Sequence, residues 1–162
     1  ARDGAQPAVF RNEGAEPGEV PRFASVTGAG NPQYWVTGAV ADFDRDGRLD
    51  VFLVEFEPAK PSLLFRNETA GGHWLQVAVA PERAVGTVVE AYRAGGAGDQ
   101  AELLFRREIV TGVGYAGGAP PTVHIGLGEL TTVDLRITAP GAEPEVLKGL
   151  KADQQVRFPG DC

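Results

Sequence analysis

A short acidic segment constrains the fold of this chain more than any other feature. It reads Asp42-Phe43-Asp44-Arg45-Asp46-Gly47-Arg48-Leu49-Asp50. Four carboxylates at this spacing can converge only where the backbone curls around a positive charge, because like charges otherwise repel one another. Ca²⁺ suits the pattern, since it takes about six to eight oxygen ligands in a flexible shell. The segment therefore predicts a calcium site made by the side chains of Asp42, Asp44, Asp46 and Asp50 and the backbone carbonyl of Arg48.

The residues on either side predict that this loop joins two β-strands. Residues 35–40 and 51–56 are rich in β-branched and aromatic side chains, which favour strands. An EF-hand would need a glutamate at its twelfth position, where this chain has Leu53. Two other interpretations are an acidic, solvated turn without a metal and a haloacid-dehalogenase-type nucleophile motif. The second is disfavoured because that motif leads into a helix, whereas Gly47 here precedes a strand.

Composition limits the classes of partner and the location of the protein. The chain has 162 residues, with 22 Gly, 12 Pro and 43% hydrophobic residues, as expected for a turn-rich globular domain. Its net charge of −7 argues against nucleic acid and anionic membranes as partners. No apolar run reaches the roughly 18 residues of a membrane span. Extracellular calcium levels would fill such a loop more readily than cytosolic ones, so we predict a secreted, extracellular or cell-surface protein.

The second half of the chain has the pattern of an all-β domain. Apolar residues alternate with polar ones in short runs separated by Gly and Pro, and no amphipathic helix is evident. The runs cover residues 74–79, 87–92, 101–106, 107–110, 122–127, 133–137 and 155–158. This spacing is typical of a β-sandwich or small barrel. We therefore predict a calcium-binding, blade-like β unit over residues 1–70 and a β-sandwich over 71–162. The predicted sandwich core is Leu75, Val77, Val88, Leu104, Ile109, Ile125, Leu135 and Ile137.

A short internal repeat bears on assembly. The segment Ala8-Val9-Phe10-Arg11-Asn12-Glu13-Gly14 recurs as Leu63-Leu64-Phe65-Arg66-Asn67-Glu68-Thr69. A single blade-like unit cannot close a propeller, which needs at least about four blades, and its exposed strand edges need cover. We therefore predict a homo-oligomer or fibre through strand edges, with residues 8–11 added as a strand to another subunit.

The ordered motifs resemble those of cartilage-acidic-protein-like secreted proteins, which join FG-GAP/VCBS calcium repeats to an ASPIC/UnbV domain. The likeness to the repeat lies in Phe10-Arg11-Asn12, in residues 38–52 and in Leu64-Phe65-Arg66-Asn67. The likeness to ASPIC/UnbV lies in His73-Trp74-Leu75, Gly112-Val113-Gly114-Tyr115, His124-Ile125-Gly126-Leu127-Gly128 and residues 133–137. The resemblance implies an extracellular, calcium-binding protein of matrix or adhesion, with no established catalytic set.

From the residues and the resemblance together we predict a calcium-binding structural or adhesion module that is not an enzyme. Its predicted partner is an extracellular protein or a glycan. The alternatives are a carbohydrate-binding module, which would display exposed aromatic rings, and a glycan-active enzyme, which needs two carboxylates about 5–10 Å apart. The two histidines, His73 and His124, lack a nearby metal-ligand partner in the sequence. We expect both to be partly buried and hydrogen-bonded to the backbone.

Overall fold

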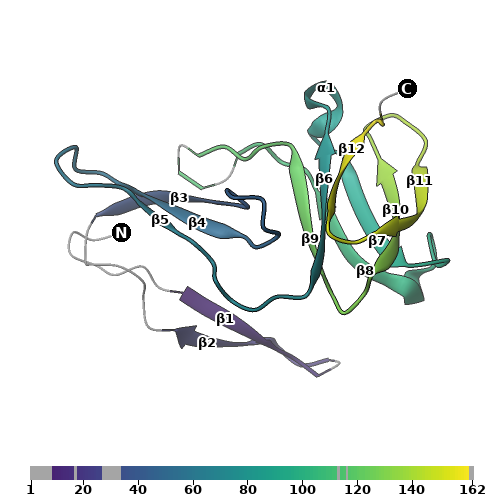
Figure 1. Ribbon diagram of the computed structural model, residues 1–162, viewed down its shortest axis with the longest axis horizontal. Coiled ribbons are helices and arrows are strands. Elements are labelled where there is room, and N and C mark those ends of the chain that lie inside the picture. The colour runs from purple at the N-terminus through teal and green to yellow at the C-terminus, as the bar shows by residue number, and fades with distance from the viewer. Residues whose placement is uncertain (1–8, 17, 27–33, 113, 116, 161–162) are drawn as a thin grey trace.

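The computed structural model describes residues 9–16, 18–26, 34–112, 114–115 and 117–160. Two residues of the motifs discussed above, Ala8 and Val113, lie outside the described residues. The protein is all-β, as predicted, and Figure 1 shows strands throughout its length. Its described helical segments are one short α-helix, α1 (Pro81–Ala84), and one 3₁₀ turn, η1 (Gln100–Glu102).

The first third of the chain forms two small antiparallel sheets. The hairpin consists of β1 (Val9–Gly14) and β2 (Arg22–Val26). The next sheet has the order β3 (Trp35–Ala41), β4 (Asp50–Glu55) and β5 (Leu63–Phe65). Thus β1, β3, β4 and β5 correspond to predicted strands, whereas β2 was not predicted.

The remainder forms a sandwich of two sheets, on the right in Figure 1. One sheet has the order β11 (Glu145–Lys151), β10 (Thr132–Thr138), β7 (Val88–Arg93) and β8 (Leu103–Glu108). The other has the order β12 (Gln154–Phe158), β6 (His73–Val79) and β9 (Thr122–Gly128), with β12 and β6 parallel. Strands β6, β7, β9, β10 and β12 match predicted runs, whereas a single strand, β8, replaces the two runs predicted over residues 101–106 and 107–110.

The two sheets enclose one apolar core. In β6 every second side chain is buried, namely Leu75, Val77 and Val79, because successive residues of a strand face opposite sides of the sheet. Six predicted core residues are buried: Leu75, Val77, Ile109, Ile125, Leu135 and Ile137. Burying such a side chain contributes about 1.5–3 kcal/mol, so the shared core accounts for much of the stability of the sandwich.

Two predicted core residues were wrong, and both errors have the same cause. Val88 is only half-buried and Leu104 is exposed. In β7 the buried side chain is the neighbouring Val89, and in β8 the side chain against the core is Phe105. A shift of one residue along a strand moves a side chain to the opposite face. Because both residues of each adjacent pair are apolar, the sequence does not show which of the two faces the core.

A buried carboxylate links the turn after β7 to the irregular part of β11. Asp134 in β10 is 1% exposed. Its Oδ2 accepts a hydrogen bond from the Gly95 backbone N–H at 2.9 Å, and its Oδ1 accepts one from Gly149 at 2.8 Å. Such charge-assisted bonds offset the cost of burying the carboxylate. Asp134 is therefore a structural residue of the sandwich.

None of the helices in the described part of the chain is long and apolar enough to cross a membrane.

Candidate metal centre

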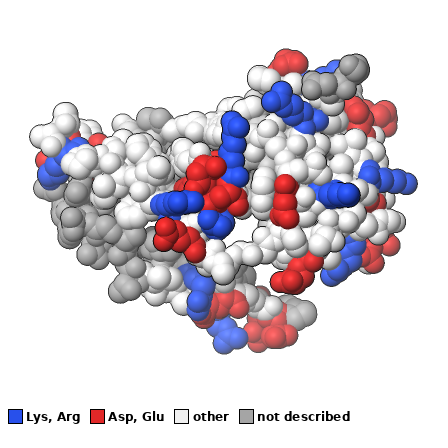
Figure 2. Space-filling model, in the orientation of Figure 1, with Lys and Arg blue, Asp and Glu red and all other residues white. Residues whose placement is uncertain are grey.

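The acidic loop occupies the connection between β3 and β4. Its backbone turns sharply, with positive φ angles of 63° at Arg45 and 86° at Gly47. Positive φ is readily available to glycine and costs other residues energy, so Gly47 suits its position. Figure 2 shows acidic and basic side chains gathered near the middle of this face, where the loop approaches the sandwich.

Three of the four predicted aspartates converge. Carboxylate oxygens of Asp42, Asp44 and Asp50 all lie within 4.8 Å of one another. Asp50 is 2% exposed at the start of β4, and its two oxygens accept backbone hydrogen bonds from Phe43 at 3.1 Å and Asn67 at 2.8 Å. The loop backbone thereby fixes the directions of the clustered carboxylates.

The loop amides also orient the other two carboxylates of the cluster. Asp42 accepts hydrogen bonds from the Asp46 N–H at 3.1 Å and the Gly47 N–H at 3.0 Å. The Asp46 N–H also lies 3.2 Å from Asp44 Oδ1. A carboxylate has about four lone-pair sites, so both groups keep acceptor capacity beyond these bonds.

The fourth aspartate faces basic side chains. Asp46 pairs with the Arg48 guanidinium and lies 3.4 Å from Arg66 Nη2. Arg66 also pairs with Asp44, at 2.7 Å from Nε to Oδ2. Desolvation alone would raise the pKa of Asp46, but the Arg48 N–H and the two guanidinium groups outweigh it and lower that pKa. The Asp44 carboxylate likewise raises the pKa of Arg66.

The donor set fits a hard cation. Asp42, Asp44 and Asp50 offer only carboxylate oxygens, the ligand type that Ca²⁺ and Mg²⁺ prefer. Their three negative charges exceed what the neighbouring arginines neutralise, because Arg48 pairs with Asp46 rather than with this trio. In the present geometry Asp46 is directed to the arginines, so its part in the predicted ligand set remains a prediction, as does that of the Arg48 carbonyl.

The sequence interpretation did not identify the residues that close the loop. Asn67 follows β5 and donates its backbone N–H to Asp50, while its carbonyl accepts a hydrogen bond from Arg48 Nε at 2.6 Å. Its side-chain amide reaches the Leu49 carbonyl at 3.3 Å. The sequence did contain a signal, the repeated Phe-Arg-Asn motif, because Arg66 and Asn67 repeat Arg11 and Asn12. The second copy of the repeat thus closes the acidic loop.

The acidic loop also touches the sandwich. A Cβ added to Gly47 would lie 2.0 Å from Trp74 Nε1 and 2.2 Å from Trp74 Cδ1. The Trp74 indole in turn stacks on His124, with ring centroids 6.0 Å apart and planes 10° apart. Gly47 therefore lets the loop lie directly against β6.

Both histidines are partly buried, as predicted, but their hydrogen-bond partners differ from those predicted. Burial lowers the pKa of His124, and the nearby Asp42 charge only partly opposes this effect. His124 Nδ1 is buried without a hydrogen-bond partner among the described residues, so the predicted backbone bond is not found there. His73 Nδ1 lies 2.7 Å from Asp153 Oδ2, and its partner is therefore a carboxylate 80 residues away.

The His73 contact predicts a pH dependence of stability. The hydrogen bond from His73 lowers the pKa of Asp153 below its usual 3.8. Desolvation opposes this effect, and the hydrogen bond from the Trp74 N–H adds to it. A lowered folded pKa adds stability above the unfolded value, which is lost as the pH falls through the folded value. Urea unfolding of wild type and Asp153→Asn should therefore differ near pH 5, and the difference should shrink as the pH falls below about 4 and through the lowered pKa of Asp153. An unchanged difference down to pH 2.5 would contradict this assignment.

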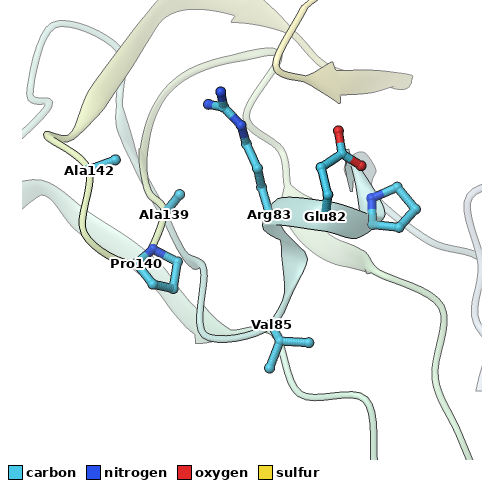
Figure 3. A pocket seen from close by; sticks show the side chains of 7 residues that line it. Glu82, Arg83, Val85, Ala139, Pro140 and Ala142 are labelled. Carbon is cyan, nitrogen blue, oxygen red and sulfur yellow. The ribbon is translucent and has the colours of Figure 1, made fainter.

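A surface hollow beside α1 lies elsewhere and has no obvious chemistry. Figure 3 shows this space of about 390 Å³ between α1 and the segment after β10. Its lining is Pro81, Glu82, Arg83, Val85, Ala139, Pro140 and Ala142. These residues supply no nucleophile beside a base and only a single carboxylate, so the acidic loop is the stronger candidate site.

Comparison with known families bears on the sandwich. The family model described as ASPIC and UnbV matches residues 80–160, half of the chain. The chain belongs to the ASPIC and UnbV family. None of the curated proteins compared with the chain matches it. The ASPIC and UnbV match covers β7 to β12 and includes Asp134, but it begins after the acidic loop, so the FG-GAP/VCBS resemblance of the first part stays a prediction.

Proposed function

We propose that the chain is an extracellular calcium-binding structural or adhesion module in which Ca²⁺ orders the loop between β3 and β4. The proposal rests on one observation: carboxylate oxygens of Asp42, Asp44 and Asp50 lie within 4.8 Å of one another. Backbone N–H groups of the chain hold these carboxylates in place. A cation there would relieve the repulsion of three charges and add its binding free energy to folding. Extracellular Ca²⁺ modules bind with Kd values of about 10⁻⁴–10⁻³ M, in keeping with a loop of three clustered carboxylates.

The ordered loop would also fix a surface for a partner. Because Gly47 lies on Trp74 and Asn67 ties β5 to Asp50, the loop contacts both the three-stranded sheet and β6. Ordering it would hold these parts of the chain in one arrangement and present the surrounding exposed side chains to an extracellular protein or glycan. The role of the metal in this proposal is structural.

Calcium titration with a matched pair of variants tests the proposal. At about 100 times Kd, Ca²⁺ should stabilise wild type by about 2.7 kcal/mol, a rise in melting temperature of about 5–10 °C. Asp44→Asn removes one clustered charge and should abolish most of the rise. The control Glu143→Gln removes an equal charge at an exposed position outside the cluster and should retain it.

Mg²⁺ should substitute poorly, since it demands tight octahedral geometry. Titration calorimetry without heat in millimolar Ca²⁺, together with equal melting of both variants, would refute the proposal.

A further inference from the structure

The two copies of the Phe-Arg-Asn repeat share a local structure. In each copy the asparagine side chain accepts a backbone N–H two residues further on, within the irregular end of β1 in the first copy and just after β5 in the second. Asn12 Oδ1 accepts the Gly14 N–H at 2.8 Å, and Asn67 Oδ1 accepts the Thr69 N–H at 3.0 Å. The repeat therefore forms a strand with the same local asparagine contact twice, as β1 and as β5.

The surroundings of the second copy define what this element packs against. β5 pairs with β4, so that Phe65 lies opposite Val51 and Leu64 opposite Phe52. Beyond the strand, Arg66 pairs with Asp44 and Asp46, and the Asn67 N–H binds Asp50. A strand of this sequence thus recognises two features at once, the edge of a β4-type strand and the acidic loop that precedes it.

The first copy lacks both of these contacts among the described residues. β1 pairs only with β2, and all six of its residues are exposed. Arg11 reaches no acidic loop there; it binds the exposed Glu13 at 2.8 Å. Phe10 and Phe23 lie on the same face of the hairpin, each 61% exposed. An isolated two-stranded hairpin is marginally stable in water, and exposed apolar side chains on it indicate a binding surface.

We propose that β1 docks onto another unit built like β3, the acidic loop and β4. In this partner unit the third strand, the equivalent of β5, is missing or displaced. The edge of β1 opposite β2 would pair with the β4-type strand. By the equivalence of the copies, Phe10 takes the position of Phe65, Arg11 pairs with the loop carboxylates, and Asn12 donates its N–H to the aspartate that starts the second strand. The product would be a four-stranded antiparallel sheet made of the hairpin and the two strands of the partner unit. In Figure 1 the hairpin stands apart from β3, β4 and β5 of its own chain.

Charge complementarity supports this partner. On docking, Arg11 would leave the exposed Glu13 carboxylate and pair with the clustered carboxylates of the partner's acidic loop. Arg66 makes such pairs in the second copy. These contacts are made by arginine and asparagine and need no metal, although Asp44 belongs both to the contact with Arg66 and to the proposed calcium cluster. The proposal also refines the predicted strand-edge assembly by naming which element the edge receives.

Register-specific disulfide formation tests the docking. The probe is a synthetic peptide of residues 34–61, which holds β3, the loop and β4 but ends before β5, with Val51→Cys. The intact chain carries Cys162→Ser and Phe10→Cys. Paired residues of antiparallel strands have Cα atoms about 4.5–5.5 Å apart, within the range that a disulfide spans. We expect cross-linking about tenfold faster than with Val9→Cys, whose side chain faces the other side of the sheet.

Two charge variants and a second probe complete the test. In the Phe10→Cys chain, Arg11→Glu should reduce cross-linking about tenfold, because it places like charges together. Glu13→Gln, which only frees Arg11 from its present partner, should preserve or increase it. The second probe is an intact chain with Leu64→Pro, Val51→Cys and Cys162→Ser, in which proline removes a backbone N–H of β5 and should weaken its pairing with β4. Equal rates for Phe10→Cys and Val9→Cys with both probes would overturn the proposal.

Discussion

Replacing Asp134 with Asn should lower the free energy of unfolding by about 2–4 kcal/mol. Both oxygens of the buried carboxylate accept backbone hydrogen bonds, from Gly95 and Gly149. An asparagine has the same shape but only one acceptor oxygen, so its NH₂ group would face one of these N–H groups. One N–H would lose its partner, and the turn at Gly95 and the β11 irregularity at Gly149 would no longer be held by a common anion.

Urea unfolding followed by far-ultraviolet circular dichroism measures this effect. The matched control is Asp99→Asn, because Asp99 is exposed and accepts a single N–H, from Ala101 at 2.9 Å. That substitution should cost less than about 1 kcal/mol. The m-value should stay the same in both variants, which would show that the change lies in stability rather than in compactness. Equal losses in the two variants would contradict the role given to Asp134.

The sequence predicted the strands best where the apolar pattern is regular. β6 and β9 alternate buried and more exposed residues, β10 has an apolar residue at every second position from Val133, and the bounds of all three were predicted to within one or two residues. β11 was missed because its inward residues, Leu147 and Leu150, are three apart rather than two. The register shifts there, near Gly149 with its φ of 65°. An irregularity of this kind removes the period of two by which a strand is recognised.

The acidic loop was predictable as a loop, but its partners were not. The spacing of Asp42, Asp44 and Asp50 is local, and these three converge as expected. The pairing of Asp46 with Arg66, the bond from Asn67 to Asp50 and the contact of Gly47 with Trp74 all join residues distant in the sequence. The pair His73 and Asp153 spans 80 residues. Such contacts depend on how the sheets pack, for which a single sequence carries little signal.

Replacing Gly47 with Ala should lower the free energy of unfolding by about 2–4 kcal/mol and separate the acidic loop from the sandwich. Two costs combine. A Cβ is disfavoured at a φ of 86°, and it would overlap the Trp74 ring, with contacts of 2.0 to 2.6 Å. The obstacle is a ring stacked on His124 rather than the free end of a flexible chain, so the loop itself has to withdraw.

The control Gly98→Ala separates the two costs. Gly98 has a φ of 94°, and nothing lies within 4 Å of its added Cβ. That variant should lose only the backbone contribution, about 1 kcal/mol. In Gly47→Ala alone, the fluorescence of Trp74 should shift to the red as water replaces the loop against the indole, while the other tryptophan, Trp35, is 7% exposed and provides a constant signal. Equal stability losses with unchanged emission would mean that the loop does not rest on β6. A larger loss of unfolding free energy in Gly47→Ala than in Gly98→Ala, together with the red shift, would show that the acidic loop packs on the sandwich at Gly47.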